Sequence, residues 1–458
     1  MKHTDIKQLF ASPETYVNKK VTVCGWVRTA RASKSIIFIE LNDGTCLKNI
    51  QLIIEESENA FETAKTSLAV GTALCVTGKV VESERNGYEM IENQITVLGE
   101  CPSDFPLQKK HHTLEYLRTI PHLRPRTRFF EAMFAVRNEL SYAIHKYFHE
   151  HGYKYVHTPI LTGSDCEGAG EMFRVTTQPW KTSHKTEGEY YADDFFGTKA
   201  SLTVSGQLEG EIAAMGLGKI YTFGPTFRAE HSNTPRHAAE FWHIEPEVCF
   251  CDLHDIIEIA EDFIKFIIRE VMRTCPEELA FFNERAEKGL IEKLEAVVSH
   301  DFAKVSYTDA VEILKNSNKE FKFPVEWGAD LQTEHEKYLT DEHFKKPVFV
   351  TDYPAKIKSF YMKQNPDGQT VAATDLLVPG VGEIIGCSER EADLGKLEDA
   401  MKKRNMPLEA YGEYIATRKF GSVPHSGFGL GLERILMYVT GVSNIRDTLL
   451  YPRTVGSL

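Results

Sequence analysis

The chain has 458 residues, of which 42% are hydrophobic and 26% charged, and its formal net charge is −13. This length predicts about two to four domains, and the net acidity argues against non-specific binding to polyanions, while it leaves room for a local basic face. No apolar run approaches the roughly 20 residues of a membrane-spanning helix, and the N-terminus lacks a signal-peptide core, so we expect a cytoplasmic protein with no membrane association.

Residues 1–102 are predicted to form a small β-barrel. Segments rich in valine, isoleucine and aromatic residues predict strands at 21–28, 36–41, 50–54, 73–81 and 88–97. Residues 42–44, with the sequence Asn-Asp-Gly, supply a turn between the second and third strands, and a helical pattern at 59–68 lies between the third and fourth. Five strands with a helix after the third give the order of an OB-fold, a barrel that often binds oligonucleotides, although other small barrels share this order.

A linker at 103–128 leads into a larger domain at 129–458. There, helical spacing from Met133 to Gly152 is followed by a strand that Pro159 ends. Strands alternate with turns over 201–250, a helix is predicted at 255–273, and the polar helical stretch at about 275–350 is interpreted as an insertion. Strands return near 348–350 and 370–377, and a helix at 430–439. Since strands and helices do not alternate regularly, we expect an α+β domain with a mainly antiparallel sheet flanked by helices.

The polar loop at 227–241 is the first of three chemically unusual segments. It contains Arg228, Glu230, Arg236 and His237 and ends at Phe241. Arginine binds phosphate through a rigid fork of donors, and an aromatic ring can stack on a base. The loop is therefore a candidate phosphate site, with a solvated hairpin loop as the alternative.

The other two unusual segments lie nearer the C-terminus. The glycine-rich run at 427–431 leads into a predicted helix that carries Arg434 near its start. It matches neither the dinucleotide-binding nor the P-loop pattern, so close packing of a helix on a sheet is the alternative. The segment at 375–391 carries Asp375 and Glu383, and carboxylates beside a phosphate site can hold Mg²⁺. By itself, a charged strand edge is the better interpretation of that segment.

In this order, the segments resemble the three sequence motifs of class II aminoacyl-tRNA synthetases. The helix and strand before Pro159 are similar to motif 1, which builds the dimer interface in that family, the loop with Arg228 to motif 2, and the run ending at Arg434 to motif 3. The OB-like domain points to the subgroup that charges aspartate, asparagine and lysine. Segments 203–208, 223–228, 424–431 and 440–447 resemble bacterial-type asparaginyl-tRNA synthetases, and the resemblance covers essentially the whole chain.

The resemblance implies a homodimeric ligase that uses ATP and Mg²⁺ to activate L-asparagine as an adenylate and then transfers it to the 3′ end of tRNA(Asn). Such chemistry depends on positioning and charge neutralisation, so no protein nucleophile is expected. By the same resemblance, Arg228 contacts the α-phosphate and Arg434 the γ-phosphate, Glu383 binds Mg²⁺, and Asp375 is a weaker candidate for the metal. The remaining implied ATP-binding residues are Glu230, Arg236 and His237 in the loop, with Phe241 stacked under adenine.

The implied asparagine pocket contains Glu167, Ser205, Gln207, Glu211 and Arg390. Arg390 can donate to an asparagine carbonyl or to an aspartate carboxylate, so it does not discriminate alone. Aspartate-specific relatives place a lysine where Gly210 stands, whereas here the neighbours are acidic. A carboxylate accepts from an amide NH₂ and repels aspartate, and we expect Glu211, in preference to Glu209, to fill this role.

The barrel is implied to bind the anticodon. Phe38 stacks on the middle uridine, Gln51 bonds the edge of that base, and Arg28 contacts backbone or base, as is usual for single-stranded RNA. The alternative for Phe38 is a place in the barrel core.

Three rival functions share part of the pattern. Gly210 and Glu211 argue against an aspartyl-tRNA synthetase. The OB-like domain argues against an asparagine synthetase built on the same catalytic fold. The presence of Arg228, Glu383 and Arg434 argues against a non-catalytic paralogue. Departures from the family pattern include Pro235, His243 and Cys387, but none removes a phosphate-binding group.

Overall fold

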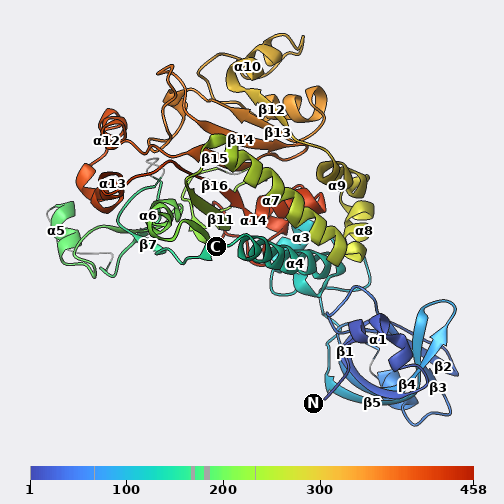
Figure 1. The fold of residues 1–458 in the computed structure, drawn as a ribbon. Helices are drawn as coiled ribbons and strands as arrows, with labels where there is room; N and C mark the ends of the chain where they lie inside the picture. Colours follow the sequence, from blue (N-terminus) through green and yellow to red (C-terminus); the bar gives the residue numbers. More distant parts are fainter. Residues whose placement is uncertain (1, 67, 167–170, 180–185, 233) are drawn as a thin grey trace. The chain divides into compact units, whose positions relative to one another are not determined.

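The computed structural model describes residues 2–66, 68–166, 171–179, 186–232 and 234–458. The chain forms two compact units, Met1–Ala135 and Val136–Leu458 (Figure 1). Within these described ranges, no helix is both long and apolar enough to cross a membrane.

The first unit is built around a closed barrel with strand order β1-β2-β3-β5-β4. Its strands are β1 (Lys20–Ala32), β2 (Ile36–Asn42), β3 (Ile50–Glu55), β4 (Ala73–Ser83) and β5 (Gly87–Gly99), and α2 (Phe61–Thr66) lies between β3 and β4. Alternate residues of these strands point inward, and α1 (Ile6–Ala11) adds Ile6 and Leu9 to the same core. The predicted OB-fold order is confirmed.

The residues proposed as a linker also lie in the first unit. They contain the helix α3 (Leu114–Thr119), and Leu107 and Leu117 pack with Phe130 in a small apolar cluster. The short 3₁₀ turns of this unit are Pro13–Thr15 and Arg124–Arg126.

The second unit contains a mixed sheet with strand order β12-β13-β14-β15-β16-β11-β10-β6. The pairs from β13 to β10 are antiparallel, and the two edge pairs, β12 with β13 and β10 with β6, are parallel. The predicted mainly antiparallel sheet is therefore confirmed. Its strands are β6 (Lys154–Tyr155), β10 (Lys219–Phe227), β11 (Glu240–Cys249), β12 (Ala303–Ser306), β13 (Val348–Thr351), β14 (Ala373–Val378), β15 (Gly382–Glu389) and β16 (His425–Gly431).

Helices cover this sheet (Figure 1). The long helix α7 (Leu253–Thr274) starts at a capping box between Asp252 and Asp255 and buries an isoleucine-rich stripe. The other helices are α4 (Arg128–Glu150), α5 (Glu187–Ala192), α6 (Gln207–Leu217), α8 (Pro276–Arg285), α9 (Leu290–Ser299), α10 (Tyr307–Lys315), α11 (Thr333–Lys337), α12 (Leu394–Lys403), α13 (Gly412–Lys419) and α14 (Leu432–Thr440). A small sheet joins β7 (Leu161–Thr162), β9 (Ala200–Leu202) and β8 (Arg174–Val175).

The stretch interpreted as a helical insertion is more varied than expected. It holds α8 to α11, but β12 also adds an edge strand to the sheet. That strand has only four residues, too few for the alternation of a strand to stand out in the sequence.

Candidate active site

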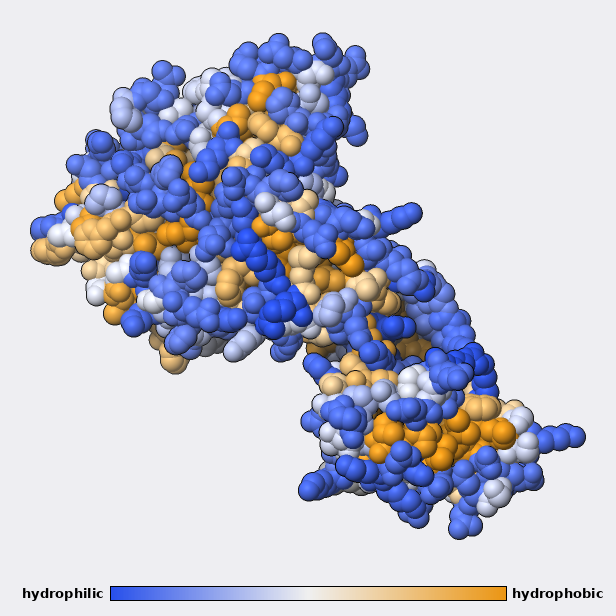
Figure 2. All heavy atoms as spheres, turned by 45° about the vertical axis from the view of Figure 1, so that its right-hand side comes forward, coloured by the Kyte–Doolittle hydropathy of each residue, from blue (hydrophilic) through white to orange (hydrophobic). Residues whose placement is uncertain are grey.

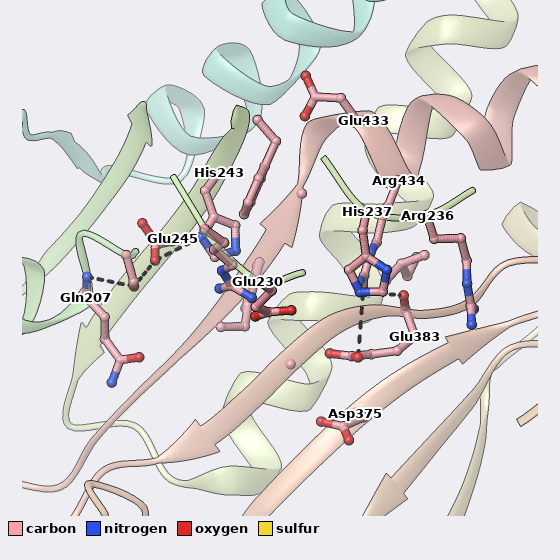
Figure 3. A pocket seen from close by; sticks show the side chains of 18 of the residues that line it. Gln207, Glu230, Arg236, His237, His243, Glu245, Asp375, Glu383, Glu433 and Arg434 are labelled. Atoms are coloured by element: carbon pink, nitrogen blue, oxygen red, sulfur yellow. Dashed lines mark hydrogen bonds and ion pairs between the residues drawn. The ribbon is translucent and has the colours of Figure 1, made fainter. Parts of the chain in front are cut away.

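A cavity of about 320 Å³ opens on the sheet where β11, β15 and β16 lie side by side. In Figure 3, Gln207 and Glu245 lie toward one end, and Arg236, Arg434 and Glu383 toward the other. The cavity brings together most residues that the sequence predicted for the larger domain: Ser205, Gln207, Arg228, Glu230, Arg236, His237, Phe241, Asp375, Glu383, Arg390 and Arg434. Glu167 lies outside the described residues.

The acidic side of the cavity is formed by two carboxylates on neighbouring strands. A β-bulge follows the Asp375–Gly386 pair between β14 and β15, and a Cβ atom built on Gly386 would lie 3.3 Å from Glu383 Oε1 and 3.8 Å from Asp375 Oδ1. Arg434 Nη1 lies 3.6 Å from Glu383 Oε2, and Lys358 Nζ lies 2.6 Å from Asp375 Oδ2. The two carboxylates thus converge, and each faces a cation.

Electrostatics distinguish these two groups. Burial raises the pKa of Asp375, and the charge of Glu383 adds to this against the opposing charge of Lys358. Burial also raises the pKa of Glu383, but the positive charges of Arg434 and Lys358 outweigh it, so the net pKa of Glu383 is below its ordinary value. Glu383 is therefore the group that stays ionised most readily.

The oxygen donors of this acidic side suit a hard cation such as Mg²⁺. Among the described residues, no group of three or more His, Cys, Asp or Glu side chains has the arrangement of a metal site. Mg²⁺ commonly binds through one or two carboxylates and completes its octahedral shell with water and substrate phosphates. Asp375 and Glu383 fit that pattern.

The loop between β10 and β11 supplies the positive side of the cavity. The Arg228 guanidinium lies 5.4 Å from the centroid of the Phe241 ring. Arg236 donates to the carbonyl of Val381, and His237 contacts Thr234. Burial and the charge of Arg434 lower the pKa of His237, which favours its neutral form.

At the opposite end, Glu245 accepts hydrogen bonds from several neighbours. Its carboxylate accepts from the Ser205 hydroxyl, from Gly206 N at 2.9 Å and from Thr222 Oγ1 at 3.1 Å, and His243 Nδ1 lies 3.1 Å away. Burial raises the pKa of Glu245, but His243 and the hydrogen bonds outweigh it, and the pKa falls to about 2. Glu245 is thus a fixed negative charge in the cavity wall.

Arg390 is held by a second glutamate of β11. Its Nη2 lies 2.6 Å from Glu247 Oε1, its Nε donates to Glu247 Oε2 at 3.2 Å, and its Nη1 donates to Ser388 Oγ at 2.7 Å. The sequence interpretation missed both Glu245 and Glu247. The signal was present: two acids two residues apart in a strand point to the same face of a sheet.

The position of Glu211 differs from the direct substrate contact expected from the sequence. Glu211 is 0% exposed, and it is not among the described residues that line the cavity. Its carboxylate accepts from Gln207 Nε2 at 2.9 Å, Tyr414 OH at 2.9 Å and Arg418 Nη2 at 2.5 Å, and lies 3.0 Å from His425 Nε2. Since Gln207 and Glu211 are four residues apart on α6, they share one face, but Glu211 lies one turn deeper. Glu247 of β11, in contrast, lines the cavity.

The three barrel residues predicted to bind RNA lie in the first unit. Phe38 is 36% exposed on the outside of β2, while Ile37 and Ile39 are buried, so the alternative of a core phenylalanine is wrong. Gln51 of β3 pairs with Glu40 in the register, which puts it on the same outer face as Phe38. Arg28 donates to Asn42 Oδ1 at 2.9 Å and to the Arg126 carbonyl, so it also braces the unit.

Comparison with known proteins agrees with both units. The family of class II tRNA synthetases (D, K and N) matches residues 114–455, and the OB-fold nucleic acid binding domain matches residues 21–98. Asparagine–tRNA ligases from Clostridium beijerinckii and Desulfitobacterium hafniense are each 54% identical, and the matches cover 99% of this chain and 98% and 99% of theirs. The asparaginyl-tRNA synthetase of Pyrococcus horikoshii, solved with asparaginyl-adenylate, superposes with a TM-score of 0.88 at 33% identity over 100% of this chain and 99% of that one.

The chain belongs to the asparaginyl-tRNA synthetase family. Its function is that of an asparagine–tRNA ligase, and the activity expected from the sequence is confirmed. In this synthetase, two of the departures from the family pattern lie at the cavity. Cys387 is buried in β15 and burial raises the pKa of its thiol well above the ordinary value, so the thiol is inert; His243 packs beside Gly429.

Proposed function

We propose that the synthetase works in two steps at this one cavity. The asparagine carboxylate attacks the α-phosphorus of ATP, which forms asparaginyl-adenylate and releases pyrophosphate. A terminal ribose hydroxyl of tRNA(Asn) then attacks the carbonyl carbon of the adenylate and releases AMP. The single observation that carries this proposal is the division of the cavity, with Arg236, Arg434 and Glu383 toward one end and Gln207 and Glu245 toward the other (Figure 3).

The cationic end is proposed to bind ATP. Arg228 contacts the α-phosphate, where charge redistributes during the attack, and Arg434 holds the γ-phosphate. Arg236 and His237 bind the pyrophosphate portion, and Phe241 stacks under adenine. Glu230, which also lines the cavity, completes this set. Arginine forks aimed at the phosphates stabilise the transition state without a nucleophile from the chain.

Glu383 and Asp375 are proposed to hold Mg²⁺ together with ATP. When bound, the metal ion neutralises part of the charge on the pyrophosphate leaving group. Lys358 and Arg434 stabilise the two carboxylates in its absence, since they lie 2.6 and 3.6 Å from Asp375 and Glu383.

The end of the cavity with Gln207 and Glu245 is proposed to bind asparagine. Arg390 donates to the side-chain carbonyl and Glu247 accepts from the side-chain NH₂. Ser205, Gln207 and Glu245 surround the ammonium group, and Glu167, which lies outside the described residues, is proposed as a further contact of that group. Glu211 does not contact the substrate in this proposal but orients residues that do. Its Oε1 accepts from Gln207 Nε2 at 2.9 Å and lies 3.8 Å from Arg390 Nε.

The barrel domain, residues 1–102, is proposed to bind the anticodon of tRNA(Asn) through Phe38, Gln51 and Arg28. Residues 103–128 link it to the catalytic domain at 129–458. On the face shown in Figure 2, hydrophobic residues gather on the barrel unit, and exposed aromatic side chains such as Phe38 are suited to stacking on bases.

We also propose a homodimer in the cytoplasm, where tRNA is charged for translation. The segment similar to motif 1 and the two residues after Pro159 leave large apolar side chains exposed: Tyr142 (67%), Tyr155 (44%), Ile160 (42%) and Leu161 (44%). Such a group of exposed apolar residues is typical of a surface that another subunit covers.

The test is ATP–pyrophosphate exchange with asparagine and with aspartate side by side. We expect exchange with asparagine and at most a trace with aspartate, because Glu247 would repel a second carboxylate in a buried pocket. Exchange with aspartate at a comparable rate would overturn the proposed pocket, and absence of exchange with either amino acid would refute the activation step.

A further inference from the structure

The inserted region of the catalytic unit reaches the phosphate end of the cavity through the short helix α11. Arg236, from the loop between β10 and β11, donates to Thr333 Oγ1 on α11 and to the Val381 carbonyl just before β15. Its Nη1 also lies 3.7 Å from Oε2 of Glu336, the next α11 residue on this side. Three segments that are distant in sequence therefore meet at one guanidinium.

The backbone at the start of β15 leaves space for this pair. Gly382 has a φ of +87°, and a Cβ atom on it would collide with Oε2 of Glu336 and lie 2.7 Å from Nη1 of Arg236. Since an L-residue would be both strained and obstructed here, glycine allows the Glu336–Arg236 pair to pack directly against the strand. The next residue is Glu383, which is proposed to bind the metal.

The charges around Glu336 explain why it needs a cation. It faces Glu383 and Asp375 from the sheet, Arg236 from the loop and Arg434 from α14. Burial raises its pKa to about 7, and the two sheet carboxylates add to this effect, while the two arginines oppose it. Arg236 is the arginine that lies in ion-pair distance of Glu336.

We propose that Glu336 is a positioning residue that holds Arg236 at the pyrophosphate end of the ATP site. This inference rests on the proposed role of Arg236 in binding the pyrophosphate portion. It gives the inserted region a part in ATP and pyrophosphate binding: a guanidinium held by a buried carboxylate loses less freedom when phosphate binds than one on a free loop.

A double-mutant cycle tests the proposal. Asparagine-dependent exchange is measured in the full-length enzyme for Arg236→Ala, Glu336→Ala, Glu336→Gln and the Arg236→Ala/Glu336→Ala double variant. Glu334→Gln is the matched control, because Glu334 lies on the same helix but accepts from Phe323 N at 2.7 Å instead of facing Arg236. Thermal unfolding of every variant reports whether the fold is intact.

We expect Arg236→Ala to raise KM for ATP and for pyrophosphate about tenfold, and Glu336→Ala about fivefold, with kcat changed less than twofold. Glu336→Gln should fall between Glu336→Ala and wild type, the double variant should be no worse than Arg236→Ala, and Glu334→Gln should resemble wild type. Additive effects in the double variant would show that Glu336 acts independently of Arg236 and would overturn the proposal. Unchanged KM values in Glu336→Ala would also overturn the proposal, but they would leave the proposed role of Arg236 intact. Unchanged KM values in Arg236→Ala would refute both the role of Arg236 and the role of Glu336.

Discussion

At the residue scale, two buried glutamates that share Arg390 have opposite pKa shifts. Burial raises the pKa of Glu211, but Arg418 and His425 outweigh it, so its pKa lies well below the ordinary value. Burial raises the pKa of Glu247 to about 7, because Arg390 offsets only part of that effect and the charge of Glu211 adds to it. The pKa values of two interacting acids tend to move apart in this way. Glu247, the one that lines the cavity, therefore titrates near neutral pH.

This leads to a pH-dependent choice between asparagine and aspartate. As the pH falls through about 7, Glu247 gains a proton, so it no longer repels an aspartate carboxylate and can donate to it. Between pH 8 and pH 6 we expect the ratio of kcat/KM for asparagine to that for aspartate to fall by up to about tenfold, in proportion to the ionised fraction. Both substrates use the same ATP site, so titration at the phosphate end cancels in this ratio. The measurement is pyrophosphate exchange with each amino acid across that range.

Two variants separate the contributions to this titration. Glu247→Gln cannot titrate, so its ratio should not change with pH. Glu211→Gln removes the negative charge that raises the Glu247 pKa, so its transition should move to lower pH. A wild-type ratio that is constant from pH 6 to pH 8 would show that Glu247 does not set the discrimination.

The sequence predicted the charged loop residues of the site better than its buried acids. Arg228 and Arg434 lie in segments that the sequence marks as chemically unusual and that resemble two synthetase motifs, and the structure places both at the cavity. Glu245 and Glu247 were missed because β11 reads as a buried strand. Glu211 was chosen for its charge beside Gly210, but strands and turns were predicted where the structure has α6. Its depth depends on how α13 and β16 pack over that helix, so it could not be predicted.

At the element scale, the glycines of β16 make room for side chains of β11. Gly427 pairs with Glu247 across the β11–β16 register, and with Ser388 on β15 at its other side. Gly429 likewise accommodates the ring of His243, whose Nε2 would lie 2.6 Å from an added Cβ. The glycine-rich run therefore shapes the part of the cavity that is proposed to bind asparagine, as well as the approach to Arg434.

Gly427→Ala should damage asparagine recognition. An added Cβ would overlap the Glu247 carboxylate, so this group has to move away from Arg390. We expect asparagine-dependent exchange to fall roughly a hundredfold, which corresponds to about 3 kcal/mol of overpacking and lost pairing. The matched control is Gly216→Ala on α6, where an added Cβ meets nothing within 4 Å and alanine favours the helix. Wild-type exchange in Gly427→Ala would mean that the Glu247–Arg390 pair is not needed.

Element prediction succeeded where a pattern was long. The barrel strands alternate over many residues and α7 carries a continuous apolar stripe, so both were predicted with nearly correct bounds. The strand predicted just before Pro159, at 153–158, is only Lys154–Tyr155 in the structure, and β12 was not predicted. Both are edge strands, whose pairing depends on distant partners that a local pattern does not reveal.

At the scale of the whole molecule, the residues proposed to bind RNA and those proposed for the chemistry lie in different units. The described residues that line the cavity all lie in the second unit, whereas Phe38 and Gln51 lie on the outer face of the barrel in the first. Two units with separate cores should tolerate a surface change in one without loss of chemistry in the other. The two half-reactions of the synthetase can therefore be perturbed independently.

Phe38→Ala should weaken tRNA charging and spare amino-acid activation. The side chain is 36% exposed while its neighbours Ile37 and Ile39 fill the core, so its removal costs little stability but deletes a stacking surface worth about 1–3 kcal/mol per base. We expect kcat/KM for tRNA(Asn) to fall about tenfold to a hundredfold, with asparagine-dependent pyrophosphate exchange unchanged. Leu98→Ala, which truncates another exposed apolar residue of the barrel (49%), is the matched control for surface truncation. Equal losses in both assays would mean that Phe38 supports the fold, and no loss in either would move anticodon recognition to another surface of the barrel.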